Sequence, residues 1–247
     1  MGYGVNVRVW GDYACFTRPE MKVERVSYDF ITPSAAKGIL DCIYWKPAIR
    51  WVIDKIHVLK PIRFTNIRRN EVKSKMSLSK VKGIMKKANH VDEQQLFSIS
   101  ETSEKKEDVY SILITDDRTQ RAAMVLRDVE YVIEAHFELI KENCGTEDTV
   151  EKHYNVALRR LRNGQFFQKP FLGTREFPCD FEIIENVDFI YRISDEFKGS
   201  KDYGYMLLNL DFQIDKKKDT MKVEPQFFKA VLVDGTLDLT NVSEVKK

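Results

Sequence analysis

The sequence lacks several features that would assign it to a common class of protein. Its cysteines are far apart and form no CxxC pair, which excludes a zinc ribbon and a thioredoxin-like site. It has no run of eighteen apolar residues, so no helix is expected to span a membrane. The first sixteen residues alternate apolar and polar side chains and reach Asp12 early, unlike a signal peptide. We therefore expect a cytoplasmic protein with reduced thiols.

The chain also lacks a strong excess of either charge. Forty Lys and Arg residues accompany 38 Asp and Glu residues, so the net charge of +2 alone predicts no nucleic-acid partner. The distribution is uneven, however, because residues 60–88 contain ten basic residues and one acid, Glu71, whereas residues 91–117 carry a net charge of −6. Neither half has strong apolar periodicity. We interpret residues 65–117 as a mobile charged insertion.

Apolar periodicity outside the insertion predicts alternating strands and helices. Alternation with a period of two predicts strands over residues 5–10, 49–64 and 118–140. A helix is expected over about 33–45, where Thr32 or Ser34 is the cap, Pro33 suits the first turn and Pro47 prevents continuation. A second helix ends at Gly164. A loop or hairpin follows, and then late strands over 203–214 and 226–239, the last pair turning at Asp234-Gly235.

The order strand, helix, strand, strand, helix, strand over residues 5–184 is that of a ferredoxin-like, or RRM-like, unit. We therefore predict an α+β fold with a ferredoxin-like domain over residues 1–185, interrupted by the charged insertion at about 65–117. A small antiparallel β region is expected over residues 186–247. Many unrelated functions use this fold, so it does not choose one.

The second helix contains the sequence EKHYNVALRRLRNGQ, with adjacent Lys152 and His153. Thr146, followed by two acids, is the expected cap. The helical spacing puts His153 just off the apolar stripe, on the same edge as Arg160. Free N–H groups at a helix start favour an anion such as phosphate. A histidine beside a lysine on such a helix is nonetheless usually structural or solvated, so the motif alone assigns no chemistry.

Five motifs, taken in order, resemble one known family. They are GDYACFTRPE near the start, IYWKP (Ile43–Pro47), TQR (Thr119–Arg121) leading into VEYVIEAHF, EKHY (Glu151–Tyr154) and FLGTREF (Phe171–Phe177). Over most of residues 11–180 the chain closely resembles the CRISPR-associated Cas family five, type I-C (Dvulg) subtype, of the RAMP superfamily. The segment 65–117 is longer and more charged than this resemblance leads us to expect.

The resemblance implies an endoribonuclease that needs no metal or other cofactor. Such proteins cut the repeat hairpin of the CRISPR precursor transcript, stay bound to the 5′ handle, and join the backbone and large subunits of an antiviral interference complex. The family's proposed catalytic residues correspond to Tyr44, Lys152 and His153. His153 would move a proton while the 2′-hydroxyl attacks, and Lys152 would stabilise the added negative charge. From the residues alone, Tyr44 is as well explained as a core aromatic beside Trp45.

A basic cluster is expected to contact RNA phosphates. Its members are Arg63, Arg68, Arg69, Lys73 and Lys75 around the insertion, Arg159, Arg160 and Arg162 on the second helix, and, by the resemblance, Arg175. Any one of them is individually better explained as a solvated charge. The RNP1 signature of an RRM is absent, so base stacking on the sheet face is not predicted, and specificity is expected in unpaired bases stacked on aromatic side chains.

Other interpretations stay open. The chain is alternatively a non-catalytic subunit that holds the 5′ handle while another protein cuts. The basic insertion alone would also suit nonspecific binding of duplex DNA. His57 and His90 are more easily explained as structural or solvated. A metal site formed by His136 with Glu134 and Glu138 is a minor option.

Overall fold

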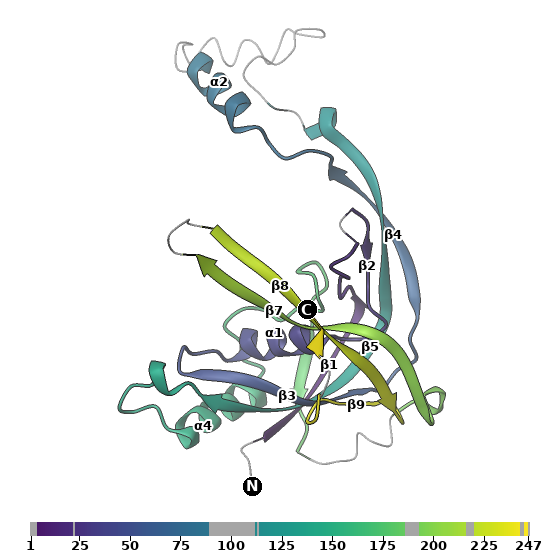
Figure 1. Ribbon diagram of the computed structural model, residues 1–247, viewed down its shortest axis with the longest axis vertical. Coiled ribbons are helices and arrows are strands. Elements are labelled where there is room, and N and C mark those ends of the chain that lie inside the picture. The colour runs from purple at the N-terminus through teal and green to yellow at the C-terminus, as the bar shows by residue number, and fades with distance from the viewer. Residues whose placement is uncertain are drawn as a thin grey trace. The chain divides into compact units, whose positions relative to one another are not determined.

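The structure is a computed structural model that describes residues 4–21, 23–88, 112, 114–185, 193–215, 220–242 and 245–246. The chain forms two compact units (Figure 1). The core unit is Met1–Ile67 with Ala123–Lys247, and the inserted unit is Arg68–Ala122. None of the described helices is long and apolar enough to cross a membrane.

The core unit is a mixed α+β structure built on a largely antiparallel sheet. Along the described part of the sheet the strand order is β10-β8-β9-β3-β5-β1-β6, while β2 and β4 pair with β5 and β7 pairs with β8. The elements are β1 (Gly4–Ala14), β2 (Arg25–Val26), α1 (Pro33–Ile43), β3 (Ile49–Val58), β4 (Phe64–Val72), β5 (Arg118–Leu139), α4 (Val150–Arg162), β6 (Asp180–Ile183), β7 (Ser200–Asp215), β8 (Thr220–Val233), β9 (Thr236–Asp238) and β10 (Val245–Lys246).

Helix α1 forms where the sequence predicts it. The Thr32 hydroxyl accepts a hydrogen bond from the backbone N–H of Ala35 (3.2 Å), and Pro33 occupies the first turn, where its missing N–H costs nothing. The helix ends at Tyr44, which has an extended backbone and donates its N–H to the carbonyl of Leu40 (2.8 Å). The Thr32 cap therefore fixes where the helix starts. At the other end, the extended backbone of Tyr44 directs the Tyr44 side chain away from the helix.

Helix α4 starts three residues later than the sequence indicates. Its cap is Thr149, whose hydroxyl accepts from the N–H of Lys152 (3.2 Å), so the expected cap at Thr146 is wrong. Thr149 has an extended backbone, as capping residues usually do. Gly164 has a φ of +60° just past the helix, which confirms it as the residue that reverses the chain.

One face of the central strands is apolar and packs against α1 and α4. Alternate residues of β1, among them Val5, Val7 and Val9, point to this face and pair with the apolar side of β5. From the helices, Leu40 and Ala157 join the same buried cluster. The prediction of a long amphipathic strand over residues 118–140 is confirmed. The strand at 49–64 is shorter than predicted, since β3 ends at Val58.

The opposite face of the central strands carries ion pairs. Arg8 contacts Glu130 and Glu182 (2.7 Å each), Arg50 contacts Glu138 (2.6 Å), and His57 lies 2.7 Å from Glu134. His136 Nδ1 lies 2.8 Å from Asp54. The three residues of the minor metal option, His136, Glu134 and Glu138, thus each have a separate partner, which argues against that option. Among the described residues no group suited to hold a metal occurs.

The late strands extend the same sheet. Strand β9 pairs with both β3 and β8, and the β8–β9 turn at Asp234-Gly235 is confirmed, with φ of +48° and +76°. Positive φ at both central residues is the two-residue turn that suits twisted hairpins. We expected residues 186–247 to form a separate region, but strands on both sides of residue 185 lie in one sheet and one compact unit.

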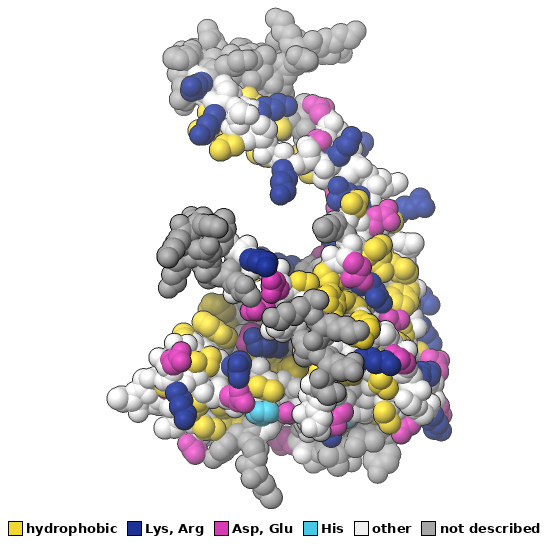
Figure 2. Space-filling view, in the orientation of Figure 1, with side chains coloured by type: hydrophobic (Ala, Val, Ile, Leu, Met, Phe, Trp, Pro, Cys, Tyr) yellow, Lys and Arg dark blue, Asp and Glu magenta, His cyan; other side chains and the backbone are white. Residues whose placement is uncertain are grey.

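The inserted unit contains regular structure where we expected a mobile insertion. Strand β4 continues into it, and it includes helix α2 (Leu78–Ala88) and a short 3-10 helix at Ile114–Asp117. The segment that enters the unit is hydrogen-bonded to the segment that leaves it. Lys73 donates its N–H to the carbonyl of Asp117 (2.8 Å), and Ser74 binds the Asp117 carboxylate. Lys and Arg side chains, in dark blue, lie along this unit in Figure 2. Residues 89–111 and 113, with His90, lie outside the described residues.

Candidate active site

The structure brings Tyr44 and His153 into contact, although 109 residues separate them. The Tyr44 hydroxyl lies 2.7 Å from Nδ1 of His153, and both side chains are buried. Tyr44 is positioned by the end of α1 and by the indole N–H of Trp51, which donates to the Tyr44 carbonyl (2.8 Å). His153 is positioned by the first turn of α4 and by the Phe137 ring, 6.4 Å away. His153 is just off the apolar stripe in the helical projection, yet its side chain is buried, with only 2% exposed.

The second imidazole nitrogen of His153 points toward Asp148. A carboxylate oxygen of Asp148 lies 3.2 Å from Nε2, but off the direction of a hydrogen bond, so Nε2 has no hydrogen-bond partner among the described residues. The Asp148 carboxylate accepts from the N–H of Gly145 (2.9 Å), which lowers the pKa of Asp148, and the nearby His153 and Lys152 act in the same direction. The Asp148 carboxylate therefore lies next to a buried nitrogen that has no hydrogen-bond partner in the described part of the chain.

The direction of the hydrogen bond in the Tyr44–His153 pair follows from the phenol. Burial raises the pKa of Tyr44 above its ordinary value, against an opposing effect of Arg160, so the phenol keeps its proton at neutral pH. The Tyr44 hydroxyl therefore donates to Nδ1 of His153. A neutral imidazole that accepts at Nδ1 carries its own N–H at Nε2. This is the tautomer that Asp148 favours electrostatically.

Lys152 is the exposed member of the predicted catalytic trio. Its ammonium lies 3.7 Å from carboxylate oxygens of Glu147 and Asp148, and its side chain is 47% exposed. Exposed pairs at this distance are weak, so an RNA phosphate can compete for the ammonium. Tyr44 and His153 are only 3% and 2% exposed. Direct contact between a phosphate and either ring therefore requires neighbouring side chains to move.

Arg160 also contacts Tyr44, a role that the sequence did not indicate. It donates from Nη1 to the carbonyl of Ile43 (2.8 Å), and its guanidinium carbon lies 5.2 Å from the centroid of the Tyr44 ring. Cations favour the face of an aromatic ring at this distance. The two-turn spacing between His153 and Arg160 put them on one edge of the helix, and this was the only sequence signal for the contact.

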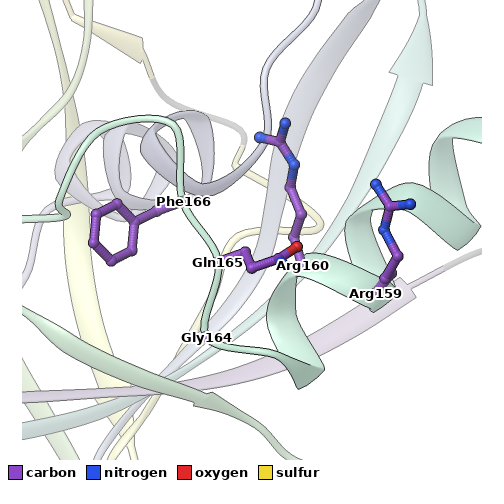
Figure 3. A pocket seen from close by; sticks show the side chains of 5 residues that line it. All are labelled: Arg159, Arg160, Gly164, Gln165 and Phe166. Atoms are coloured by element: carbon purple, nitrogen blue, oxygen red, sulfur yellow. The ribbon is translucent and has the colours of Figure 1, made fainter.

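An open pocket of about 440 Å³ lies at the C-terminal end of α4. It is lined by Arg159, Arg160, Gly164, Gln165 and Phe166. Figure 3 shows both guanidinium groups extending from the helix end, with the Gln165 side chain directed to the same side of the loop and the Phe166 ring to the other. This end of the helix therefore presents two cations and one amide to solvent.

The predicted RNA-binding residues fall in both units. Arg63, Arg159, Arg160, Arg162 and Arg175 belong to the core unit, whereas Arg68, Arg69, Lys73 and Lys75 belong to the inserted unit. Arg162 forms an exposed ion pair with Glu185 through two of its nitrogens (2.8 and 2.9 Å). Arg175 lines a separate hollow of about 320 Å³ near Lys169.

The FLGTREF motif has a structural role that its glycine explains. Gly173 has a φ of +84°, and a Cβ there would lie 2.0 Å from the carbonyl oxygen of Cys15. The adjacent Leu172 accepts from the N–H of Cys15 (3.0 Å), so this loop is attached to the end of β1. Only glycine permits both the conformation and the close approach.

Comparison with known proteins identifies relatives over nearly the whole chain. The Cas5d family, described as CRISPR-associated protein (Cas_Cas5), matches residues 4–240. A protein of Mannheimia succiniciproducens named CRISPR pre-crRNA endoribonuclease Cas5d is 47% identical over 241 residues, 97% of this chain and 96% of that protein. A protein of the same name from Thermus thermophilus is 37% identical over 177 residues, 72% of this chain and 62% of that protein.

Solved structures share the fold. A crystal structure described as a CRISPR-associated protein superposes with a TM-score of 0.64 at 20% identity, covering 100% of this chain and 97% of that one. The functionally uncharacterized protein SMU1763c from Streptococcus mutans superposes with a TM-score of 0.61 at 22% identity, covering 100% and 98%. The α+β fold is thus one found among CRISPR-associated proteins. Within that class, the chain belongs to the Cas5d family.

Proposed function

We propose that this chain is a pre-crRNA endoribonuclease that cuts CRISPR precursor RNA within the repeat. The observation that carries this proposal is the 2.7 Å contact between the Tyr44 hydroxyl and His153 Nδ1, with Lys152 beside it at the start of α4. By the resemblance, these three residues correspond to the family's proposed catalytic trio, and their proximity supports the proposal. The relatives named CRISPR pre-crRNA endoribonuclease Cas5d support the same conclusion.

The pair supplies a proton relay that needs no phenolate. The 2′-hydroxyl of the RNA gives its proton to the Tyr44 oxygen while Tyr44 gives its own proton to Nδ1 of His153. The resulting alkoxide attacks the phosphorus and the bond to the 5′-oxygen breaks; the 5′-oxygen takes a proton from solvent water, which yields a 2′,3′-cyclic phosphate and a 5′-hydroxyl. The Asp148 carboxylate stabilises the imidazolium, and Lys152 stabilises the charge that develops on the phosphate.

We also propose that the scaffold of this site is a ferredoxin-like unit. Supporting this are the element order β1, α1, β3, β5, α4, β6 and the strand order β3-β5-β1-β6 with antiparallel neighbours. In that arrangement both helices lie on one face of the sheet. The end of α1 and the start of α4 then meet, and they supply Tyr44 and His153.

The deciding experiment incubates purified protein with radiolabelled CRISPR repeat RNA in EDTA. We expect a cut at one position, with the products named above. The matched variants are His153→Ala and His153→Gln, because a glutamine amide can still accept from Tyr44 but cannot take its proton. Both are expected to bind RNA nearly as wild type and to cut at least about 100-fold more slowly. Wild-type cleavage by His153→Gln, with a normal circular dichroism spectrum, would remove His153 from the mechanism.

A second function follows from the burial of the pair. Because Tyr44 and His153 are nearly inaccessible, the chain is alternatively a non-catalytic subunit that holds the 5′ handle. RNA binding without cutting in the same assay supports this alternative. Under either function we propose that the chain stays on the 5′ handle and joins the backbone and large subunits of the interference complex. Binding of duplex DNA by the basic side chains is a further proposal, tested by adding DNA to the binding assay.

A further inference from the structure

We propose that the pocket at the C-terminal end of α4 is a subsite for one unpaired nucleotide next to the cut. In this subsite Arg159 and Arg160 bind a phosphate of the RNA, and the side-chain amide of Gln165 hydrogen-bonds the edge of the base. The inference rests on the proposed function, since it names where the substrate of that reaction is held.

The two arginines are available to an anion. Within the described part of the chain Arg159 has no carboxylate partner, and Arg160 uses Nη1 on a carbonyl oxygen rather than on an acid. Arg162, one turn away on the same helix, is instead paired with Glu185. A guanidinium offers several donors in a plane and suits phosphate oxygens. Among the described residues, the two arginines of the pocket thus have no carboxylate partner, whereas Arg162 has one.

The backbone that carries the Gln165 side chain is held in place. Gly164 turns the chain, and the N–H of Gln165 donates to the carbonyl of Arg160 (2.8 Å). Two residues further on, the N–H groups of Phe167 and Gln168 donate to the carbonyl of Cys42 (2.9 and 3.1 Å). The side-chain amide of Gln165 offers one donor group and one acceptor to the edge of a base. Because the loop backbone is fixed at both ends, binding does not have to order it.

The pocket is linked to the candidate active site through Arg160. Its guanidinium lies over the Tyr44 ring, and Arg160 is also one of the residues that line the pocket. Arg160 therefore connects a phosphate held in the pocket with the Tyr44 ring. We assign Arg160 as a positioning residue that aligns the neighbouring scissile phosphate with Tyr44, whereas Arg159 contributes binding alone.

The pocket size agrees with a small occupant. Its volume of about 440 Å³ lies within the range of small-ligand sites, roughly 300 to 1,000 Å³. The opening to solvent allows the RNA strand to enter and leave on either side. Base-specific reading of RNA takes place mainly at unpaired nucleotides, whose edges are free. A single unpaired nucleotide at the hairpin base is the occupant that fits these conditions.

The test combines protein variants with abasic substitutions in the repeat RNA, measured by fluorescence anisotropy and single-turnover cleavage. Gln165→Ala is expected to weaken binding roughly 3- to 10-fold, the effect of one hydrogen bond. An abasic site at one unpaired position flanking the cut should weaken wild-type binding to the same extent. It should cause no further loss with Gln165→Ala, because both changes remove the same contact. Losses that multiply at every position would overturn the assignment of Gln165.

The arginines are tested by the salt dependence of affinity. Arg159→Gln is expected to reduce the slope of log affinity against log salt by about 0.7, the value for one phosphate contact on a single strand. The matched control is Arg127→Gln, an exposed arginine on β5, which should leave the slope unchanged. Arg160→Lys keeps the charge but not the planar fork, so we expect a lower cleavage rate at saturating protein with an unchanged melting temperature and salt slope. Equal effects of Arg159→Gln and Arg127→Gln would refute the phosphate site.

These outcomes separate the subsite from the proposed function. If wild type neither binds nor cuts repeat RNA, the proposed function fails. If wild type cuts and Gln165→Ala matches Arg127→Gln, only the subsite fails. If Arg159→Gln weakens duplex DNA binding as much as RNA binding, and abasic sites have no effect, the pocket is a general phosphate contact and the nucleotide subsite is refuted.

Discussion

Replacing Tyr44 with phenylalanine removes one oxygen from the centre of the candidate site. The ring still fills its buried position, so no cavity forms, but Nδ1 of His153 loses its partner at 2.7 Å. An unsatisfied buried acceptor costs about 1 to 3 kcal/mol. For a chain of this size each kcal/mol lowers the melting temperature by about 2 to 4 °C, so we expect a decrease of roughly 2 to 12 °C. The relay also loses its first proton acceptor, which should slow cleavage at least about 100-fold.

The measurements are thermal unfolding followed by circular dichroism and single-turnover cleavage at saturating protein. Tyr13→Phe is the matched control, because this tyrosine is 43% exposed and lies outside the candidate site, so neither quantity should change. The double variant Tyr44→Phe with His153→Ala should be less destabilised than the sum of the single variants, since the two share one interaction. A melting temperature within 1 °C of wild type (about 0.3 to 0.5 kcal/mol) together with wild-type cleavage would refute the reasoning.

Three further predictions concern the scaffold. Gly173→Ala should lower the free energy of unfolding by at least about 2 kcal/mol, from strain at positive φ and overpacking, whereas Gly38→Ala, with open space around it in α1, should not destabilise in the same chemical denaturation assay. Burial raises the pKa of Cys179 to about 12, so its thiol should react with Ellman's reagent at pH 8 only after unfolding; fast reaction in the folded protein would contradict this. The hydrogen bond from His57 lowers the pKa of Glu134, so this carboxylate stabilises the fold above the ordinary carboxyl pKa of about 4.3, and the contribution disappears as pH falls through the lowered value. In Glu134→Gln the melting temperature should therefore fall less steeply as the pH is lowered. An unchanged pH dependence would count against a stabilising Glu134–His57 pair.

Local signals predicted the helices and the long central strand well. Thr32, Pro33 and the bend before Pro47 act within a few residues, so the bounds of α1 could be obtained from the sequence. Capping of α4 was assigned to Thr146 because two acids follow it, but Asp148 instead accepts from Gly145, and Thr149 caps the helix. Both threonines are acceptable caps, and only the tertiary position of the helix chooses between them.

Contacts between distant segments could not be obtained from periodicity. His153 lies near the boundary of the apolar stripe, where a rotation of a few degrees decides between solvent and core. The phenol of Tyr44 and the ring of Phe137 determine that it is buried. The contact of Arg160 with Ile43 spans 117 residues, and nothing in the sequence near either residue indicates it. The resemblance to a family, rather than the pattern, brought Tyr44 and His153 together before the structure did.

The inserted unit was interpreted as irregular because charge dominates its composition. Helix α2 is as amphipathic as α1, but it is much less hydrophobic overall because it contains several lysines. The alternate exposure along β4 is likewise a weak signal among so many charged side chains. Strand β4 is instead specified by its partner β5, which the sequence does identify as a long strand. Pairing with a well-formed neighbour thus orders a segment whose own sequence does not demand it.

The backbone bridge from Lys73 to Asp117 makes the length of the chain between them adjustable. Because Lys73 and Asp117 are already paired, the segment between them can be lengthened or shortened at a small entropic penalty. Each doubling of the loop length costs about 0.6 kcal/mol. The same bridge offers a clean excision point, at which residues 75–116 can be exchanged for a tight turn to yield a minimal nuclease scaffold.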